Sequence, residues 1–540
     1  MFSLTLYDIN IIITYSEEKR QGNLLMKPKL FESLKGYTKK DLFNDLIAGL
    51  MVAIIALPLS IALGIQSVPQ SVSNNGIQFG LITAIVAGFF ISALGGSRHQ
   101  IGGPTAAFVV ILYGYLANPE IGVLGLALAG VMAGVILITM GYLKAGSIMK
   151  FFPYPITIGF TTGIGITLLI GQIKDFCGFS AGGTEAIAKL ISYFENIKTF
   201  DFFTFLVGAL GLATVILIPK FSKKIPSAFV ALILCTGLTL IFNELMGKEV
   251  ATIGSTYGEV KAGFFPINFS AISSVKFSAL IVPSIVIAFL CAIESLLSAT
   301  VASGITGAPY NANQELVGQG VANICSSLLG GLPATGAIAR TAAGIENGAR
   351  SPLAGMFHAV FVLIMYFALM GIMQYIPLAV FSAILISVAI NMSRFPLFIK
   401  LLRFGIRDVI VLVVTCVLTV AFDLTYGVIG GVVVTFIVNL KNLFKGVKIV
   451  EVENAKEPTI SVEGAVYFLN ANKLVDVASK FLENSDKLVI DLKKADSIDQ
   501  TAMEKLVSLN KKIKAQGKDI DLTNYNKKIE KRFDKYFKVF

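Results

Sequence analysis

Two short stretches place glycine, proline and threonine where an apolar segment begins. One covers 102–107 and reads Gly-Gly-Pro-Thr-Ala-Ala; the other covers 330–341 and reads Gly-Gly-Leu-Pro-Ala-Thr-Gly-Ala-Ile-Ala-Arg-Thr. Proline is tolerated in the first turn of a helix, and glycine lets a backbone approach another group closely. The N–H groups of that first turn are unpaired and carry partial positive charge. Each stretch is therefore expected to open a helix that can bind an anion.

Three side chains in these stretches could add to such a site. Arg340 is the only basic residue of the second stretch, and it could attract the anion or pair with an acidic residue for structural reasons. Thr105 and Thr335 could donate their hydroxyls to the anion, or bond to the backbone of their own helices.

Glu294 lies in the apolar run Ala292–Ser298. A carboxylate at the centre of a membrane span costs about 2.5–3.5 kcal/mol, so it requires a cavity or a partner. Ser298 follows one helical turn later and shares the same face. Glu294 is interpreted either as a ligand of a coupling ion or a proton carrier, or as a structural carboxylate paired with Arg340.

The composition indicates a protein that crosses a membrane many times. The chain has 540 residues, of which 55% are hydrophobic and 15% charged, and its mean hydropathy is +0.75. Apolar runs near the length of a membrane span recur from about Leu46 to Leu440. The formal net charge is +11, but the basic residues gather in short connections between spans, which argues for control of orientation and against nucleic-acid binding.

Several classes of function are disfavoured. The five cysteines form no C-x-x-C pair and only two histidines exist, so no metal site is expected. A phosphate-binding G-x-x-x-x-G-K-[ST] loop is missing, which disfavours ATP hydrolysis. We therefore expect no cofactor and no enzyme activity.

About fourteen spans are expected, in two sets of seven with the third member of each set short. They lie near residues 46–64, 79–94, 105–115, 123–143, 155–173, 203–218, 229–242, 280–299, 316–329, 334–343, 355–370, 377–390, 410–422 and 427–440. Paired short segments interrupted by glycine and proline are typical of the midplane substrate site of a transporter. Lysine and arginine alternate between the connections in the way expected if both termini are cytoplasmic.

The composition changes after Leu440 to a lysine- and aspartate-rich segment. The run 488–492 is typical of a buried strand and 501–516 of an amphipathic helix, so a small cytoplasmic α/β domain is expected. The chain is accordingly divided into an N-terminal cytoplasmic segment (1–41), a transmembrane domain (42–442) and this C-terminal domain (443–540).

These motifs resemble the SulP anion-transporter family, and the C-terminal segment resembles its STAS domain. The matching runs are Ala56–Leu59, Gly102–Ala106, Glu294–Ala299, Thr306-Gly307, Asn313–Leu316, Gln319–Asn323 and Gly330–Thr341.

The resemblance implies an all-α polytopic membrane domain built as a seven-plus-seven inverted repeat, with core and gate domains, and a STAS domain. It implies a homodimer in the inner membrane that moves anions by an elevator motion. The substrate is expected near Pro58, Gly103, Thr105, Ala106, Ala107, Thr335, Gly336, Ala337 and Arg340. The coupling cation is expected near Glu294, Ser298 and Ile338.

The chain departs from this pattern at the cation site. Sodium-coupled bicarbonate members carry Asp where this chain has Glu294, and Thr where it has Ser298 and Ile338, which favours protons or uncoupled exchange. In the C-terminal domain Asp499-Gln500-Thr501 replaces the serine-bearing turn of phosphorylated relatives, which argues against control through serine.

The sequence thus predicts a secondary active transporter of a small anion, sulfate or bicarbonate, that is coupled to protons or works as an exchanger. A C4-dicarboxylate transporter, a sodium-coupled bicarbonate symporter and an uncoupled anion channel remain alternatives. Its expected partners are the anion, a coupling cation (H⁺ or Na⁺), membrane lipid and a second copy of the chain.

Overall fold

The computed structural model describes most of the chain. The described residues are 26–146, 153–180, 182, 186–222, 225–266, 269–403, 405–422, 424–443, 447–452, 457–514, 517–522, 525–527 and 529–530. Residues 1–25 of the expected N-terminal segment and residues 531–540 lie outside this part.

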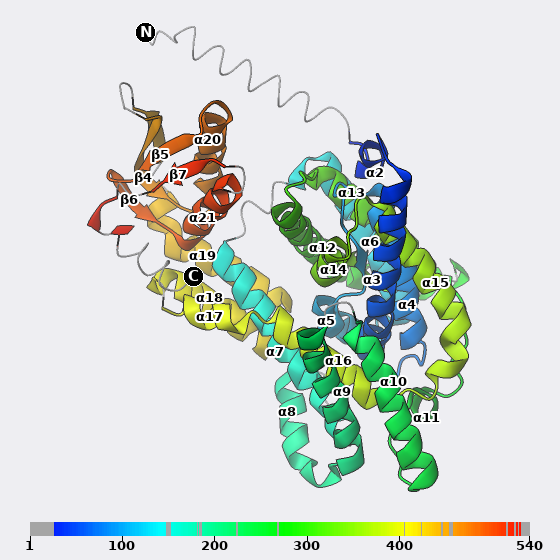
Figure 1. The fold of residues 1–540 in the computed structure, drawn as a ribbon. Helices are drawn as coiled ribbons and strands as arrows, with labels where there is room; N and C mark the ends of the chain where they lie inside the picture. The colour runs from blue at the N-terminus through cyan, green and yellow to red at the C-terminus, as the bar shows by residue number, and fades with distance from the viewer. Residues whose placement is uncertain are drawn as a thin grey trace.

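The membrane domain consists of two groups of helices that pack mainly among themselves (Figure 1). The first bundle contains α3 (Lys39–Ser67), α4 (Gly76–Leu94), α5 (Ala106–Ala117), α6 (Gly122–Tyr142), α12 (Phe277–Thr306), α13 (Ala312–Leu328), α14 (Ile338–Glu346) and α15 (Leu353–Met373). The second bundle contains α7 (Tyr154–Cys177), α8 (Ala186–Glu195), α9 (Phe202–Phe221), α10 (Ser227–Leu240, continued by Ile241–Leu245), α16 (Leu378–Met392), α17 (Phe395–Leu401), α18 (Ile406–Ala421) and α19 (Leu424–Leu443). Short helices α2 (Lys29–Ser33) and α11 (Ile253–Tyr257) and two 3-10 turns (Ile197–Thr199 and Phe269–Ser274) complete this domain.

The expected helical membrane domain is confirmed. Within the described residues, nine helices are long and apolar enough to cross a membrane, and each of the fourteen expected spans contains a helix. The α3 helix begins at a capping box, in which Thr38 Oγ accepts from the N–H of Asp41 and the Asp41 carboxylate accepts from the N–H of Thr38. The seven-plus-seven inverted repeat stays a prediction.

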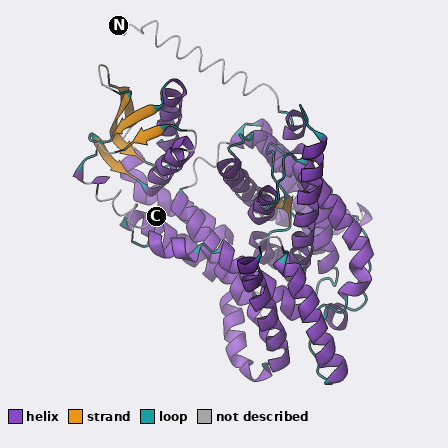
Figure 2. Cartoon of the chain, viewed as in Figure 1, coloured by secondary structure: helices purple, strands orange, loops and turns teal. Residues whose placement is uncertain are grey.

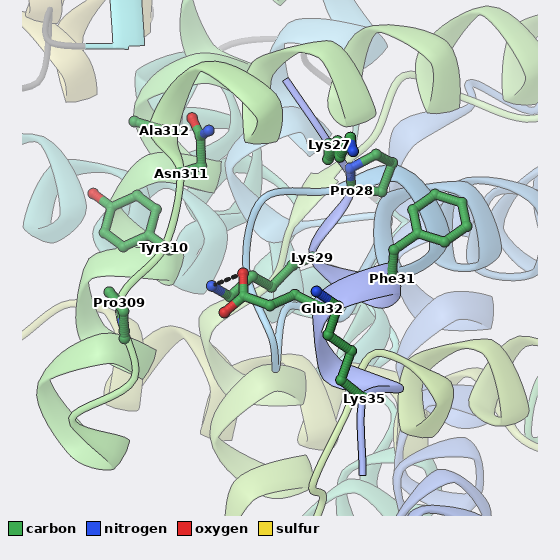
Figure 3. A pocket seen from close by; sticks show the side chains of 10 residues that line it. All are labelled: Lys27, Pro28, Lys29, Phe31, Glu32, Lys35, Pro309, Tyr310, Asn311 and Ala312. Carbon is green, nitrogen blue, oxygen red and sulfur yellow. Dashed lines mark hydrogen bonds and ion pairs between the residues drawn. The ribbon is translucent and has the colours of Figure 1, made fainter. Parts of the chain in front are cut away.

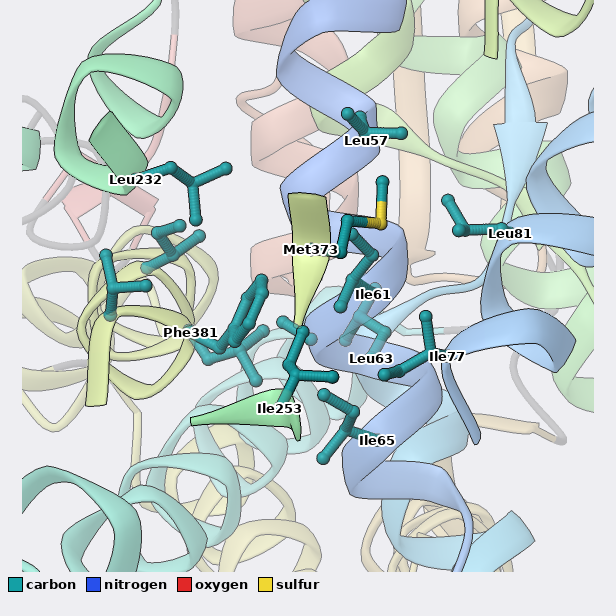
Figure 4. Packing of buried hydrophobic residues seen from close by; sticks show 14 of the residues in the cluster. Leu57, Ile61, Leu63, Ile65, Ile77, Leu81, Leu232, Ile253, Met373 and Phe381 are labelled. Atoms are coloured by element: carbon teal, nitrogen blue, oxygen red, sulfur yellow. The ribbon is translucent and has the colours of Figure 1, made fainter. Parts of the chain in front are cut away.

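The largest apolar core joins the two bundles through α3. Leu57, Ile61 and Leu63 of α3 belong to one buried cluster with Leu81 of α4 and Phe381 of α16 (Figure 4). Helix α3 packs on other helices of the first bundle and also on α16 and α10 of the second bundle. Any relative motion of the bundles must therefore rearrange contacts along this helix.

Two very short strands lie within the membrane domain. β1 (Gly102–Gly103) pairs antiparallel with β2 (Thr335–Gly336), with Gly102 opposite Gly336 and Gly103 opposite Thr335. These residues were expected to start helices. Helix α14 instead begins at Ile338, four residues after the expected start at Ala334, because the intervening backbone forms this ladder and the turn that follows it.

The C-terminal domain, where nearly all the strands of Figure 2 lie, contains a five-stranded sheet and two helices. Its elements are β3 (Val447–Glu451), β4 (Thr459–Val466), α20 (Ala471–Asn484), β5 (Lys487–Asp491), β6 (Ala495–Ile498), α21 (Gln500–Lys514) and β7 (Asp519–Asp521). The sheet order is β3-β4-β5-β7; β6 also pairs with β4, and only the β3–β4 pair is antiparallel. The expected strand and helix are β5 and α21, and residues 515–516 of the expected helix lie outside the described residues.

The C-terminal domain packs on the second bundle. The N–H of Tyr154, the first residue of α7, donates to Thr501 Oγ1 of α21 at 3.0 Å. The ring of Phe468 in the C-terminal domain contacts Phe436 of α19 with the two centroids 6.3 Å apart. One end of α7 is thereby anchored to the C-terminal domain.

Candidate functional site

The β1–β2 ladder brings the starts of α5 and α14 together inside the membrane domain. Helix α5 begins at Ala106, three residues after β1 ends, and α14 begins at Ile338, two residues after β2 ends. Because the strands are antiparallel, the two helices leave the ladder in different directions and their N-termini stay close to it.

Neither helix start is capped by a side chain. Thr105 stands at the N-cap of α5, but its hydroxyl donates to Glu294 Oε2 at 2.9 Å. Ala337 stands at the N-cap of α14 and has no side-chain acceptor; its own N–H bonds to the carbonyl of Ile101 at 2.9 Å. The N–H groups that precede Phe108 in α5 and Thr341 in α14 are therefore available to an anion.

Arg340 lies in the first turn of α14, and its positive charge has no acidic partner among the described residues. Its side chain is 1% exposed, and it donates to the carbonyl of Gly102 at 3.1 Å and to Ser60 Oγ at 3.0 Å. Its Nε has no hydrogen-bond partner, and among the described residues no carboxylate lies within ion-pair distance of it. A buried cation without a counter-ion is costly, so the site is short of one negative charge.

Gly103 makes room for Arg340. Its φ is +149°, and a Cβ at this position would lie 1.8 Å from Nη1 of Arg340. A side chain here would displace the guanidinium, which explains why the residue before Pro104 is glycine.

Glu294 is partly buried, and it makes fewer hydrogen bonds than the two buried carboxylates of the first bundle, Asp45 and Glu315. Asp45 accepts hydrogen bonds from Tyr37, Arg350 and Ser351. Glu315 accepts from the N–H groups of Gly96 and Ser97 and from Gln319. Among the described residues, Thr105 alone donates a hydrogen bond to Glu294. Glu294 and Arg340 form no ion pair, so the structural pairing of the two that the sequence left open is wrong.

A cavity of about 270 Å³ lies between the two bundles and in front of both helix starts. The first bundle and its connections contribute Leu59, Leu63, Pro104, Thr105, Ala106, Ile293, Glu294, Leu297, Gly336, Ala337, Ile338, Ala339 and Arg340. The second bundle and its connections contribute Ile156, Thr157, Phe160, Thr161, Val388, Asn391, Met392, Arg394 and Val428.

Most of the expected site residues meet in this cavity. Thr105, Ala106, Gly336, Ala337, Arg340, Glu294 and Ile338 line it, whereas Pro58, Gly103, Ala107, Thr335 and Ser298 do not. Thr335 is turned towards α12, where its hydroxyl contacts Ser295 Oγ at 2.6 Å. Ser298 contacts Thr341 Oγ1 at 3.4 Å.

The sequence reasoning missed one residue that orients Arg340 and the polar residues that the second bundle brings to the cavity. Ser60 holds Arg340, and Thr157, Thr161, Asn391 and Arg394 supply polar groups from the second bundle. The serine two residues after Pro58 in an apolar span was a usable signal. The others face the cavity only because of how the bundles pack, which no local pattern reveals.

A largely apolar cavity inside a helical membrane domain, with two uncapped helix N-termini and a buried arginine that lacks a counter-ion among the described residues, has the features expected of an anion site in a membrane transport protein. Comparison with known proteins agrees. The model of the Sulfate permease family matches residues 42–415, and that of the STAS domain matches residues 448–537.

Two relatives and one solved structure show the extent of the similarity. YvdB of Bacillus subtilis (strain 168), whose name gives sulfate transport as a provisional assignment, is 36% identical over 492 residues, covering 89% of this chain and 91% of the relative. The bicarbonate transporter BicA of Picosynechococcus sp. is 31% identical over 418 residues, covering 75% of this chain and 71% of the relative. The solved transmembrane domain of a cyanobacterium bicarbonate transporter BicA superposes with a TM-score of 0.65 at 29% identity, covering 73% of this chain and 98% of that domain.

The chain belongs to the sulfate permease family, and it is an anion transporter with a C-terminal STAS domain. Its relatives are named transporters and not enzymes.

Proposed function

We propose that the chain carries a small oxyanion, sulfate or bicarbonate, bound between the N-termini of α5 and α14. The observation that carries this proposal is the unpaired guanidinium of Arg340 behind two uncapped helix starts. An oxyanion supplies the missing negative charge and several acceptors for the free N–H groups. The provisional sulfate assignment of one relative and the bicarbonate name of another support this substrate class.

We assign the coupling role to a proton on Glu294. This carboxyl group lines the same cavity as Arg340 and has a single hydrogen bond, from Thr105. When ionised it repels an anion in the cavity, and when protonated it does not, so the anion and the proton favour each other's binding. Such reciprocal binding is what symport requires.

Sodium fits the same position poorly. A sodium ion needs several oxygen ligands, yet Ile338 offers no side-chain oxygen, and Ser298 lies outside the cavity wall and contacts Thr341. The proposal is therefore a proton-coupled anion symporter, in preference to a sodium-coupled one.

The composition of the cavity wall suggests which bundle moves during transport. The first bundle supplies the anion-binding groups, and the second bundle supplies five apolar residues together with Thr157, Thr161, Asn391 and Arg394. We assign the first bundle as the moving core domain and the second as the gate domain of an elevator. Leu59 and Leu63 of α3 would slide along the gate during the cycle.

The proposal extends to the setting of the protein. It places a homodimer in the inner membrane with both termini in the cytoplasm, and it divides the chain at residues 41/42 and 442/443. A reporter fused after Phe540 should be active only in the cytoplasm; activity on the other side of the membrane would contradict this orientation.

Uptake into proteoliposomes tests the coupling. Labelled sulfate and bicarbonate should enter faster under an inward proton gradient, and Glu294→Gln should abolish that stimulation while anion binding is retained. Glutamine keeps the size of the side chain and can still accept from Thr105. Glu346→Gln, the same change at an exposed position of α14, is the matched control and should behave like the unmodified protein. Stimulation that persists in Glu294→Gln would refute the proton-carrier role.

A further inference from the structure

A second pocket, unrelated to the transport cavity, lies beside helix α2 at the end of the membrane domain that carries the C-terminal domain (Figure 1). Its volume is about 650 Å³, which is typical of a small-ligand site. The wall residues are Lys27, Pro28, Lys29, Phe31, Glu32, Lys35, Pro309, Tyr310, Asn311 and Ala312 (Figure 3).

Both walls of the pocket are fixed to the same turn of the chain. The N–H of Lys29 donates to the carbonyl of Gly95 at 2.9 Å, and the N–H of Asn311 donates to the carbonyl of Gly96 at 2.9 Å. On the second wall, the hydroxyl of Tyr310 contacts Thr300 Oγ1 at 2.7 Å. The backbone on both sides of the pocket is thus held in place before any ligand binds.

The pocket carries excess positive charge. Three lysines face one carboxylate, and Glu32 is already paired with Lys29 at 2.6 Å. Among the described residues, Lys27 and Lys35 form no ion pair, and both are exposed. Asn311 uses its Oδ1 to cap α13 by accepting from the N–H groups of Asn313 and Gln314, which leaves its amide donor for a ligand. The pocket therefore suits an anion with several acceptor oxygens.

The surroundings of the pocket are apolar. Phe31 is 62% exposed and points away from Tyr310 (Figure 3), and Leu34 is 41% exposed. One turn into α3, the exposed apolar surface of the membrane span begins with Leu42 and Phe43, which are 42% and 63% exposed. Residues 27–35, which include α2, thus carry exposed lysines together with exposed apolar side chains shortly before a membrane span, which is typical of a segment that lies in the headgroup region of a bilayer.

We propose that this pocket binds the phosphate headgroup of an anionic lipid. Lys27 and Lys35 would hold the phosphate, with Asn311 as a further donor, while Phe31 and Leu34 contact the acyl chains. A basic pocket between membrane helices is a recognised type of site for such headgroups. The proposal does not depend on the identity of the transported anion.

Lipid retention tests the site. The full chain is reconstituted in equal parts of dioleoylphosphatidylglycerol and dioleoylphosphatidylcholine, extracted in mild detergent, and examined by native mass spectrometry. The unmodified protein should retain phosphatidylglycerol in preference to phosphatidylcholine. Each lysine near an anionic lipid surface contributes about 1 kcal/mol, or roughly fivefold in affinity, so Lys27→Gln/Lys35→Gln should reduce retention by roughly tenfold or more.

Two controls make the test specific. Lys39→Gln/Lys40→Gln removes the same charge from exposed positions at the start of α3, outside the pocket, and should retain the lipid normally. Glycerol phosphate, the soluble headgroup alone, should bind much more weakly than the lipid because it lacks acyl chains. Equal loss in both double variants would overturn the site, and glycerol phosphate that binds as tightly as the lipid would overturn the lipid as the ligand.

Discussion

Among single residues, Arg340 is the position on which the anion site depends most. It is buried, it is oriented by Gly102 and Ser60, and none of the described carboxylates pairs with it. Its two acceptors are neutral, so the desolvation of the guanidinium is not offset by any described carboxylate, and a bound anion would offset it. A structural arginine would be expected to have an acidic partner nearby.

Gly103 offers a test that leaves every charge in place. Gly103→Ala would put a methyl group 1.8 Å from the present position of Nη1 of Arg340, so the guanidinium must move and its bond to Gly102 must break. Losing one partner of a buried charged hydrogen bond costs about 1–3 kcal/mol, so the anion affinity should fall roughly 5- to 150-fold.

The control for this change is Gly114→Ala in α5, where an added Cβ meets nothing within 4 Å. Affinity measured by isothermal titration with sulfate should be unchanged in this control. Equal affinities in all three proteins would show that the orientation of Arg340 is unimportant.

The sequence was sufficient to identify several residues of the proposed site, but not the contacts between them. Arg340, Glu294 and Thr105 were identified because charged and hydroxyl groups are rare in apolar spans. Their relations were not predictable: the Thr105–Glu294 bond joins residues 189 positions apart, and the Arg340–Ser60 bond joins residues 280 positions apart. The sequence left open a pairing of Glu294 with Arg340 because it cannot show which of two polar neighbours a side chain faces.

At the scale of elements, α7 connects the cavity to both ends of the membrane domain. Tyr154 at its start bonds to the C-terminal domain, and Asp175 lies 21 residues later, about 30 Å along the helix. Thr157 near the start of α7 and the exposed Arg394 line the cavity, so the cavity lies nearer to the Tyr154 end of α7. The other end is closed by contacts between the two bundles.

Two of those closing contacts are polar. Gln66 Nε2 of α3 donates to Asp175 Oδ2 of α7 at 3.0 Å, and the ammonium of Lys189 in α8 lies 5.4 Å from the ring centroid of Tyr113 in α5. Both contacts link the first bundle to the second. In an elevator they must break when the cavity opens to the other side.

Gln66→Ala should therefore loosen the closed end. Loss of one hydrogen bond is worth about 0.5–1.5 kcal/mol, so amide exchange in the last turns of α7 should accelerate roughly 2- to 12-fold in hydrogen–deuterium exchange. The control Gln374→Ala removes a local bond to the carbonyl of Gly371 and should leave α7 unchanged. Unaltered exchange near Asp175 in Gln66→Ala would show that the contact does not close this end.

The elements themselves were largely predictable, since long apolar runs produced the expected helices. The short ladder was not: two-residue strands have no alternating pattern, and the glycines that form them were assigned to helix starts. The predicted start of α14 at Ala334 was wrong because Thr335 and Gly336 pair with Gly103 and Gly102, and the helix begins only at Ile338.

At the scale of the whole molecule, one carboxyl group of the C-terminal domain, that of Asp499, should make the stability of the protein depend on pH. It lies close enough to the second bundle to be affected by Asp408 of α18. Burial, and then the negative charge of Asp408, raise the pKa of Asp499 from its ordinary value of 3.8 to about 7. Between these two values the folded chain keeps a proton that the unfolded chain has lost. The contribution of Asp499 to the stability of the folded state is therefore greatest below about pH 4 and is lost as the pH rises through 7.

This linkage predicts the melting behaviour of the full chain. The Tm of the C-terminal domain should fall between pH 5 and pH 8, and Asp499→Asn should flatten that dependence because the amide does not titrate. Asp476→Asn, at an exposed position of α20, should keep the slope of the unmodified protein. A slope in Asp499→Asn as steep as in the unmodified chain would contradict the assignment.

The division into a transport domain and an α/β domain was visible in the composition, but their contact was not. Nothing in the sequence around Thr501 indicates that its hydroxyl accepts from the first N–H of α7. Long-range docking depends on the shape of both surfaces, and neither surface exists until the separate domains have folded.

The most direct test of the central claim is uptake of labelled sulfate and bicarbonate by proteoliposomes containing the unmodified chain or Arg340→Gln. Glutamine can still donate to one of the two acceptors at Gly102 and Ser60 but carries no charge. If the charge of Arg340 binds the transported anion, the unmodified chain should take up at least one of the two anions, and the variant should lose that uptake while remaining folded, with an unchanged elution volume. Uptake by Arg340→Gln at the unmodified rate and KM would contradict the account.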